Sequence, residues 1–199
     1  MRLATLTVLA TIGVVCGFAP AASAGVKVLV KTQTYDVSGT TGEALIESMD
    51  HSGPRHGLMA HAIAQTSYTK AWDFDFIKAN GSCRIKQAHG TLKLTFAYPR
   101  VVSDLPSSLE RRWKRFFAGV TAHEQTHGRI AREMMRATEK SLTGLTVQND
   151  AQCTKTRREA RQRINAIFDE YEARQNAFDA REHREGGHVE YLVDALAKS

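Results

Sequence analysis

Hydrophobic and polar residues alternate along the first half of the chain, as expected for β-strands. Over residues 62–77 the large apolar residues are aromatic and stand at every second position. After Ser82 a second run again has its large apolar residues at every second position. The apolar positions of the two runs are Tyr68, Trp72, Phe74 and Phe76, then Leu92, Leu94, Phe96 and Tyr98. Asn80-Gly81 between them is typical of a two-residue hairpin turn. The pattern predicts a long antiparallel hairpin with one apolar face that packs against other elements.

Two further elements are predicted before the hairpin. A looser alternation over residues 25–37 predicts another strand, and residues 41–49 predict a short helix with a threonine near its start. Within the hairpin, Gly90 is expected to mark a bulge or a break, and Pro99 is expected to end the sheet region.

In the second half the apolar residues recur at three- and four-residue spacing. This period runs from Leu109 to about Leu142 and from about Thr154 to Glu185, and it predicts two long helices. Gly119 is expected to divide the first helix, Gly144 to end it, and Gly186-Gly187 to end the second.

A short terminal helix is expected over residues 188–199, with Tyr191, Leu192 and Leu196 as its contacts. The sequence contains no internal repeat, linker or low-complexity tract. We therefore expect one α+β domain over residues 25–199, an antiparallel hairpin sheet packed on two long helices.

Residues 1–24 have the composition of a secretory signal peptide. A positive start at Arg2 precedes an apolar run, and Ala22-Ser23-Ala24 matches an A-x-A cleavage site. A membrane anchor and a lipoprotein signal at Cys16 are the alternatives, but the apolar run is short and Val15 fits poorly before a lipid-modified cysteine. We expect a cleaved signal peptide, a periplasmic or secreted location and no membrane span after cleavage.

Charge and cysteine content narrow the choice of partners. The formal net charge is +6, but basic clusters such as Arg111-Arg112 and Arg157-Arg158 alternate with acidic residues. This mixture favours solvated helix faces over nucleic-acid binding.

Cys83 and Cys153 remain after cleavage and are expected to form a disulfide in an oxidising compartment. Closing a loop of about 70 residues would stabilise the fold by roughly 2–4 kcal/mol.

The sequence HEQTH at residues 123–127 points to metal chemistry. Histidines four apart lie on one face of a helix and can bind one Zn²⁺, while the adjacent glutamate can act as a general base. The alternative is a surface helix with two solvated histidines. Against it, the histidines continue an apolar stripe formed by Phe116, Val120 and Ile130. We expect His123 and His127 to bind Zn²⁺ and Glu124 to be the catalytic base.

A catalytic zinc site usually has three protein ligands, and the motif supplies only two. The metzincin pattern does not continue, because Ile130 and Glu133 stand where it requires glycine and histidine. His183 is the expected third ligand, four residues after Asp179 near the end of the second long helix. Asp179 is a possible second-shell acceptor or an alternative ligand. The competing interpretation of His183 is a helix-end histidine beside the C-terminal dipole.

Several separate segments agree, in order, with the DUF922 family, bacterial proteins described as predicted secreted zinc-dependent proteases. These segments are Tyr35-Asp36-Val37-Ser38-Gly39, Trp72-Asp73-Phe74, Cys83, residues 123–128 and Cys153. The chain resembles this family from about residue 30 to about residue 187. Near its C-terminus the family carries a tyrosine-aspartate, a threonine and a histidine-glycine. Phe178-Asp179 and His183 match this pattern, whereas Glu182 and Arg184 depart from it.

Together these observations predict a zincin-like zinc metallopeptidase that hydrolyses peptide bonds in a protein or peptide substrate. An edge strand of the hairpin would hold an extended peptide by main-chain pairing. Tyr171 is the candidate to stabilise the oxyanion. Two alternatives stay open: a non-catalytic zinc-binding periplasmic or envelope module on the same scaffold, and an enzyme that hydrolyses a non-peptide amide. A closed site with four protein ligands would favour the non-catalytic module.

Overall fold

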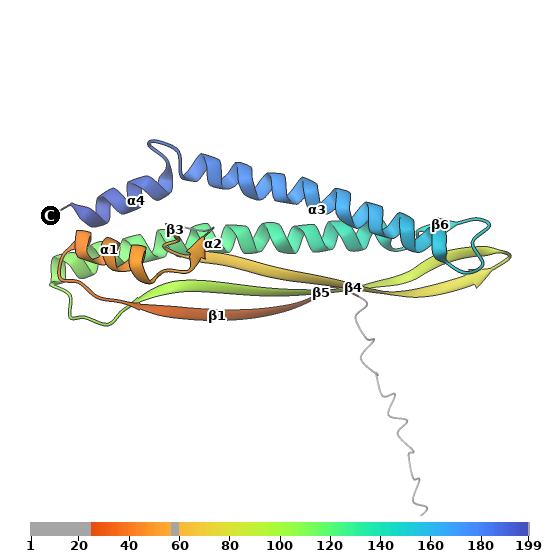
Figure 1. Cartoon of the computed structure of the whole chain (residues 1–199), viewed down its shortest axis with the longest axis horizontal. Coiled ribbons are helices and arrows are strands. Elements are labelled where there is room, and N and C mark those ends of the chain that lie inside the picture. The colour runs from red at the N-terminus through yellow and green to blue at the C-terminus, as the bar shows by residue number, and fades with distance from the viewer. Residues whose placement is uncertain (1–24, 57–59, 199) are drawn as a thin grey trace, which may run out of the picture.

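The computed structural model describes residues 25–56 and 60–198, so the expected signal peptide lies outside the described residues. An elongated, open four-stranded sheet lies against helices along its length (Figure 1). In chain order the elements are β1 (Lys27–Val37), α1 (Gly42–Ser52), β2 (Arg55–His56), β3 (Ala60–His61), β4 (Gln65–Ala79), β5 (Ser82–Val101), α2 (Ser107–Leu142), β6 (Thr146–Val147), α3 (Thr154–Glu182) and α4 (His188–Ala197). The architecture is therefore mixed α/β.

The predicted hairpin is confirmed in β4 and β5, which pair antiparallel. Asn80 and Gly81 form the turn between them with φ of 49° and 72°, the left-handed values that such a turn needs. The expectation of a bulge or break at Gly90 is wrong, because Gly90 pairs regularly with Trp72. The irregularity in the pairing lies between Asp75 and Phe76 of β4. Gly90 is required for packing, since a Cβ there would lie within 2.9 Å of Trp72 and Met135 side-chain atoms.

Strand β5 is the centre of the sheet, with β4 antiparallel on one side and β1 parallel on the other. It continues to Val101, so the expectation that Pro99 ends the sheet is wrong. Pro99 is tolerated because β4 pairs with β5 only as far as Ala97, so in the described part of the chain one side of β5 has no strand partner beyond that point. The sheet order also places β4 at an edge of the sheet.

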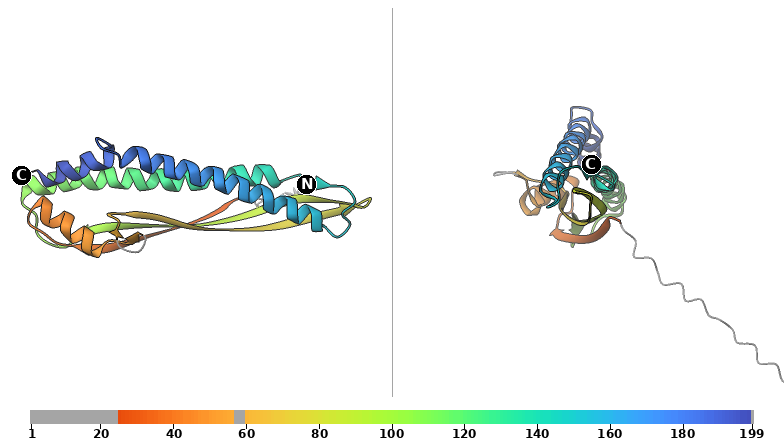
Figure 2. Two further views of the ribbon diagram at one scale, coloured as in Figure 1. Left: turned by 45° about the horizontal axis from the view of Figure 1, so that its top comes forward. Right: turned by 90° about the vertical axis from the view of Figure 1, so that its right-hand side faces the viewer.

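Helices α2 and α3 lie side by side on the apolar face of the hairpin, and α4 packs against the first part of α2 (Figure 2). The aromatic side chains on one face of β4 point toward these helices. Tyr68 and Trp72 pack with Leu92, Met134 and Met135. Both long helices are thus confirmed, and among the described residues no helix has the length and apolar character that crossing a bilayer requires.

Helix α2 is continuous, so the division expected at Gly119 is wrong. A Cβ at Gly119 would lie 2.4 Å from a methyl carbon of Leu192, which shows that the glycine admits α4 rather than breaking α2. The terminal helix is confirmed, with Leu192 and Leu196 buried as expected. The contact expected at Tyr191 is wrong, because this side chain is 64% exposed.

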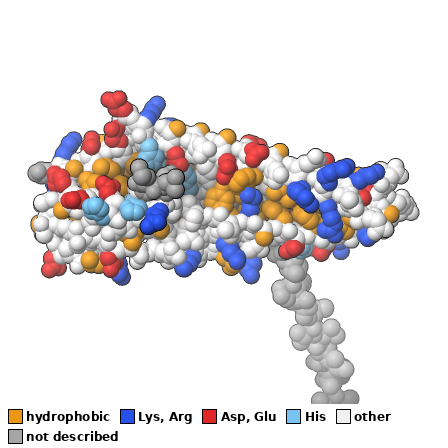
Figure 3. All heavy atoms as spheres, viewed as in Figure 1, with side chains coloured by type: hydrophobic (Ala, Val, Ile, Leu, Met, Phe, Trp, Pro, Cys, Tyr) orange, Lys and Arg blue, Asp and Glu red, His pale blue; other side chains and the backbone are white. Residues whose placement is uncertain are grey.

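Basic side chains gather toward the hairpin tip and the start of α3, whereas histidines gather in the half that carries α1 and α4 (Figure 3). Two basic side chains lie over aromatic rings. The Arg157 guanidinium lies 4.4 Å from the Phe76 ring centroid, and Lys70 Nζ lies 3.0 Å from that of Phe168. Part of the positive charge therefore stabilises the packing of α3 on β4.

The predicted disulfide between Cys83 and Cys153 is confirmed and ties the start of β5 to the start of α3. Asp150 reinforces the same corner. Its carboxylate accepts hydrogen bonds from the backbone N–H groups of Lys155 and Thr156 and from the Thr156 hydroxyl. These N–H groups belong to the first turn of α3, so Asp150 caps that helix from four residues before its first residue, Thr154.

Replacing Asp150 with asparagine is expected to lower stability at neutral pH and to flatten its dependence on acid. Burial alone would raise the pKa of the Asp150 carboxyl, but the hydrogen bonds from Thr156 and Lys155 outweigh it and lower the pKa. A lowered folded-state pKa contributes stability above the ordinary value of 3.8, and this contribution is lost as the pH falls further. Denaturant unfolding from pH 7 to pH 2 should show the two proteins converging below 3.8; parallel curves would contradict the assignment.

Replacing Gly128 with alanine is expected to cost about 1–3 kcal/mol, the usual range for overpacking. The new Cβ would lie 2.7 Å from Cζ of Phe96, a β5 ring that is 6% exposed and stacked on Tyr98. Chemical denaturation measures the loss. The double variant with Phe96→Leu is the control, because removing the ring should recover part of the loss; strict additivity would show that the two residues do not compete for space.

Candidate metal centre

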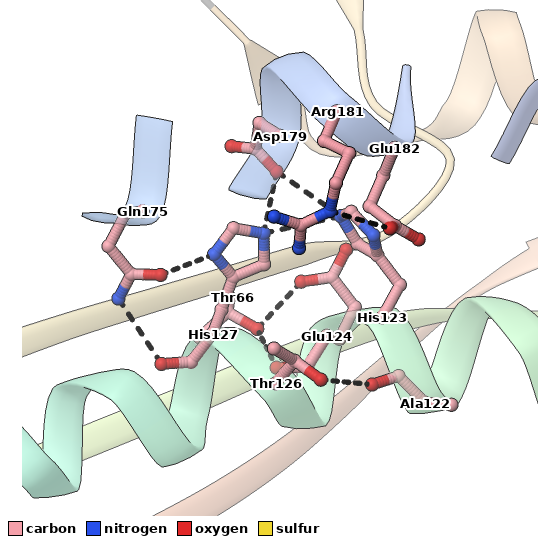
Figure 4. Close-up of polar contacts among 10 residues, drawn as sticks. All are labelled: Thr66, Ala122, His123, Glu124, Thr126, His127, Gln175, Asp179, Arg181 and Glu182. Atoms are coloured by element: carbon pink, nitrogen blue, oxygen red, sulfur yellow. Dashed lines mark hydrogen bonds and ion pairs between the residues drawn. The ribbon is translucent and has the colours of Figure 1, made fainter. Parts of the chain in front are cut away.

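His123 and His127 of α2 face Asp179 of α3 across the line where the two helices meet (Figure 4). The Nε2 atoms of the two histidines are 3.2 Å apart. Oδ1 of Asp179 lies 3.3 Å from Nε2 of His123 and 2.7 Å from Nε2 of His127. Ligand atoms of a tetrahedral Zn²⁺ with bonds of about 2.0–2.1 Å are separated by about 3.3 Å. The three atoms therefore approximate three corners of such a tetrahedron.

Gln175 sets the orientation of the His127 ring. Its Nε2 donates to the backbone carbonyl of His127 at 3.2 Å, so its Oε1 faces Nδ1 of the ring at 2.6 Å as an acceptor. Nδ1 must then carry the proton, which leaves the lone pair on Nε2, the atom that faces Asp179. A ligating histidine commonly donates its second nitrogen to an oxygen in this way.

Two imidazole nitrogens and a carboxylate oxygen at these distances require a cation or shared protons between them. Burial alone would raise the pKa of Asp179, but hydrogen bonds from His123 and His127 hold it well below its usual range. Burial alone would lower the pKa of His127, but hydrogen bonds with Asp179 and Gln175 raise it. This donor set suits Zn²⁺, which accepts nitrogen and oxygen ligands in tetrahedral geometry. The residues present therefore fit the metal.

His183, the expected third ligand, lies at the C-terminal end of α3 and is exposed. Its ring centroid is 5.2 Å from that of His123. One ligand atom each from His123, Asp179 and His183 lie within 4.8 Å of one another, a limit that is wider than a tetrahedral edge. Burial and the neighbouring His123 lower the pKa of the His183 imidazole. The geometry favours Asp179 as the third ligand and places His183 beside it.

Glu124 is buried at 6% exposure, and Thr66 of β4 holds its carboxylate. The Thr66 hydroxyl lies 2.6 Å from Oε2 of Glu124 and 3.0 Å from the Glu124 backbone carbonyl. This hydrogen bond joins β4 to α2 between residues that are 58 positions apart in the sequence. The hydroxyl fixes the position of the Glu124 carboxylate in the site.

These groups open into a cleft of about 420 Å³ that has α2, β4 and α3 as its walls. Its lining brings together all five predicted site residues, His123, Glu124, His127, Asp179 and His183. Thr66 and Gln175 also line it, and sequence reasoning missed both. Gln175 had a signal, because it lies four residues before Asp179 on the same helix face, whereas no pattern in the sequence connects Thr66 with Glu124. Tyr171, the candidate to stabilise the oxyanion, packs in a hydrophobic cluster beneath Arg174 and is not among the residues that line the cleft. The tyrosine that lines the cleft is Tyr68.

The fold and the site define a mixed α/β protein whose paired helices carry a donor set of two histidines and one carboxylate. The model of a family described as bacterial proteins of unknown function, DUF922, matches residues 32–188. The chain belongs to the DUF922 family. No curated protein and no solved structure matches it. Its function must therefore be argued from the site.

Proposed function

We propose that this protein is a zinc-dependent peptidase with a zincin-like arrangement of its site, exported to the periplasm or the medium. The observation that carries the proposal is the convergence of His123, His127 and Asp179 on one point beside the buried carboxylate of Glu124. These three residues would hold Zn²⁺ and leave the fourth tetrahedral position open, as in catalytic rather than structural zinc sites. The disulfide and the signal-like sequence of residues 1–24 support export.

Zn²⁺ bound there would supply Lewis-acid activation of a water molecule and of the substrate carbonyl. Glu124 takes a proton from the water as the water oxygen bonds to the carbonyl carbon. When the C–N bond breaks, Glu124 returns that proton to the leaving amine. Thr66 holds the Glu124 carboxylate and Gln175 holds the His127 ring, so both groups are positioned before substrate arrives. The edge strand β4 can pair with the main chain of an extended peptide.

A non-catalytic zinc-binding module is the second candidate, and the position of His183 favours it. If His183 moved onto the metal as a fourth protein ligand, the site would be closed and structural. Against this stands Glu124, because a structural site does not need a buried carboxylate that lines the same cleft and is held by Thr66.

Metal analysis and a peptide screen on the purified mature chain test the two candidates together. A peptidase should contain one Zn²⁺ per chain, cleave some members of a mixed peptide library, lose that activity to a chelator and regain it with added Zn²⁺. Stoichiometric zinc without cleavage would support the non-catalytic module. A chain that binds no zinc would contradict both.

A further inference from the structure

A second, more apolar cavity adjoins the metal centre. Its volume is about 660 Å³, and it shares His123, Glu124 and Asp179 with the cleft described above. The apolar side chains in its lining come from the segment before β4 and from α2, α3 and α4: Ala62, Ile63, Ala64, Val120, Ala180, Val189 and Val193. The cleft therefore continues on both sides of the donor atoms, with Gln175 and Asn176 in one direction and these apolar walls in the other.

The apolar walls are part of the core. Val120 is 5% exposed and both Ala64 and Val189 are 9% exposed, and Val120 and Ala64 belong to the cluster that joins α1, α2 and α4. Val120 lies one turn before Glu124 on α2, so the wall and the proposed base share one helix face. Side chains fixed by packing in this way form a preformed pocket.

The edge strand sets the direction in which a peptide would cross the two cavities. Antiparallel pairing is the more stable arrangement, and a peptide antiparallel to β4 runs from the Tyr68 level toward Ala64. Thr66 contacts Glu124 and so marks the level of the reacting carbonyl. The first residue after the scissile bond would then lie opposite Gln65, and the second residue would lie beside Ala64, at the apolar cavity.

We infer that this cavity selects substrates with an apolar side chain, such as leucine or phenylalanine, at the second residue after the scissile bond. The inference rests on the proposed peptidase function and adds a substrate class to it. Discrimination by an apolar pocket between large and small apolar side chains is typically 10–200-fold in kcat/KM, so at least about tenfold is expected for leucine over alanine.

A basic residue is the competing occupant, because Asp50 and Glu190 also line the cavity. Both carboxylates belong to exposed residues, and Oε2 of Glu190 already accepts a hydrogen bond from the Gly186 N–H. Apart from His123 and Glu124, the buried side chains of the lining are aliphatic, so a charged group would lose water there without gaining a new partner.

Cleavage-site mapping by mass spectrometry on a degenerate peptide library tests the inference with the zinc-loaded mature chain. Large apolar residues should be enriched at the second residue after the cut. Enrichment of lysine or arginine there, enrichment before the cut instead, or no preference would each overturn the inference while leaving the peptidase proposal intact. A library that is not cleaved at all would overturn both.

Binding to the Glu124→Gln variant gives a readout that does not depend on turnover. Two fluorescent peptides that differ only in leucine or aspartate at that position should differ at least about tenfold in Kd. Ala180→Phe, which adds bulk to the cavity lining from α3, should weaken binding of the leucine peptide and spare an alanine peptide. Ala177→Phe is the matched control on the same helix, outside both linings. Equal effects of the two substitutions, or equal binding of the leucine and aspartate peptides, would overturn the inference.

Discussion

Replacing Glu124 with glutamine is expected to reduce peptide hydrolysis by about 10²–10⁴-fold while leaving the zinc content unchanged. General-base catalysis contributes about that factor, and an amide cannot accept and return a proton at neutral pH. The substitution keeps the size of a side chain that is 6% exposed, and the amide oxygen can still accept a hydrogen bond from Thr66. Turnover should therefore fall without unfolding.

The measurement is kcat/KM on a cleaved peptide, together with zinc content and a thermal melt. Glu172→Gln is the matched control, because Glu172 also lines the cleft, from α3. Its carboxylate forms no hydrogen bond or ion pair with His123, His127 or Asp179. Undiminished turnover in the Glu124 variant would remove it as the base. Equal losses in the two variants would point to a general effect of charge in the cleft.

Replacing Asp179 with alanine is expected to weaken zinc binding by more than about a hundredfold. Loss of an outer-shell partner typically costs 10–100-fold, and loss of a direct ligand costs more. Oδ1 of Asp179 lies 2.7 Å and 3.3 Å from the two histidine nitrogens, so the substitution removes one of three converging donors. His183→Ala is expected to weaken zinc binding by about tenfold at most, the smaller effect of a residue outside the three donors.

Competition with a chromogenic zinc chelator measures both affinities. Asp169→Ala, an exposed carboxylate on the same helix, is the control for a change in charge. If His183→Ala lost the metal and Asp179→Ala retained it, the third ligand would be His183, as the sequence alone suggested. Near-complete loss in both variants would support a closed site with four protein ligands.

The elements with strong local periodicity could be predicted from the sequence. Alternation predicts β4 and β5, a three- and four-residue period predicts α2 and α3, and the Asn80-Gly81 pair predicts the turn. Each signal depends on residues that are neighbours in the chain, because a strand or a helix presents one face at a fixed period. The errors fall on residues whose role depends on distant partners. Gly119 and Gly90 resemble a break and a bulge in isolation, yet they admit Leu192 and Met135.

For this protein, the sequence alone determined the HEQTH motif at residues 123–127, the helix that carries it and the pairing of Cys83 with Cys153. It also favoured Asp179 and His183 as the further candidates. Only the tertiary structure decided which of these lies closest to both histidines, and only it brought Gln175 and Thr66 to the site. The reason is physical: spacing within one helix places His123 and His127 on one face, whereas the register between α2 and α3 depends on side-chain packing along the whole interface.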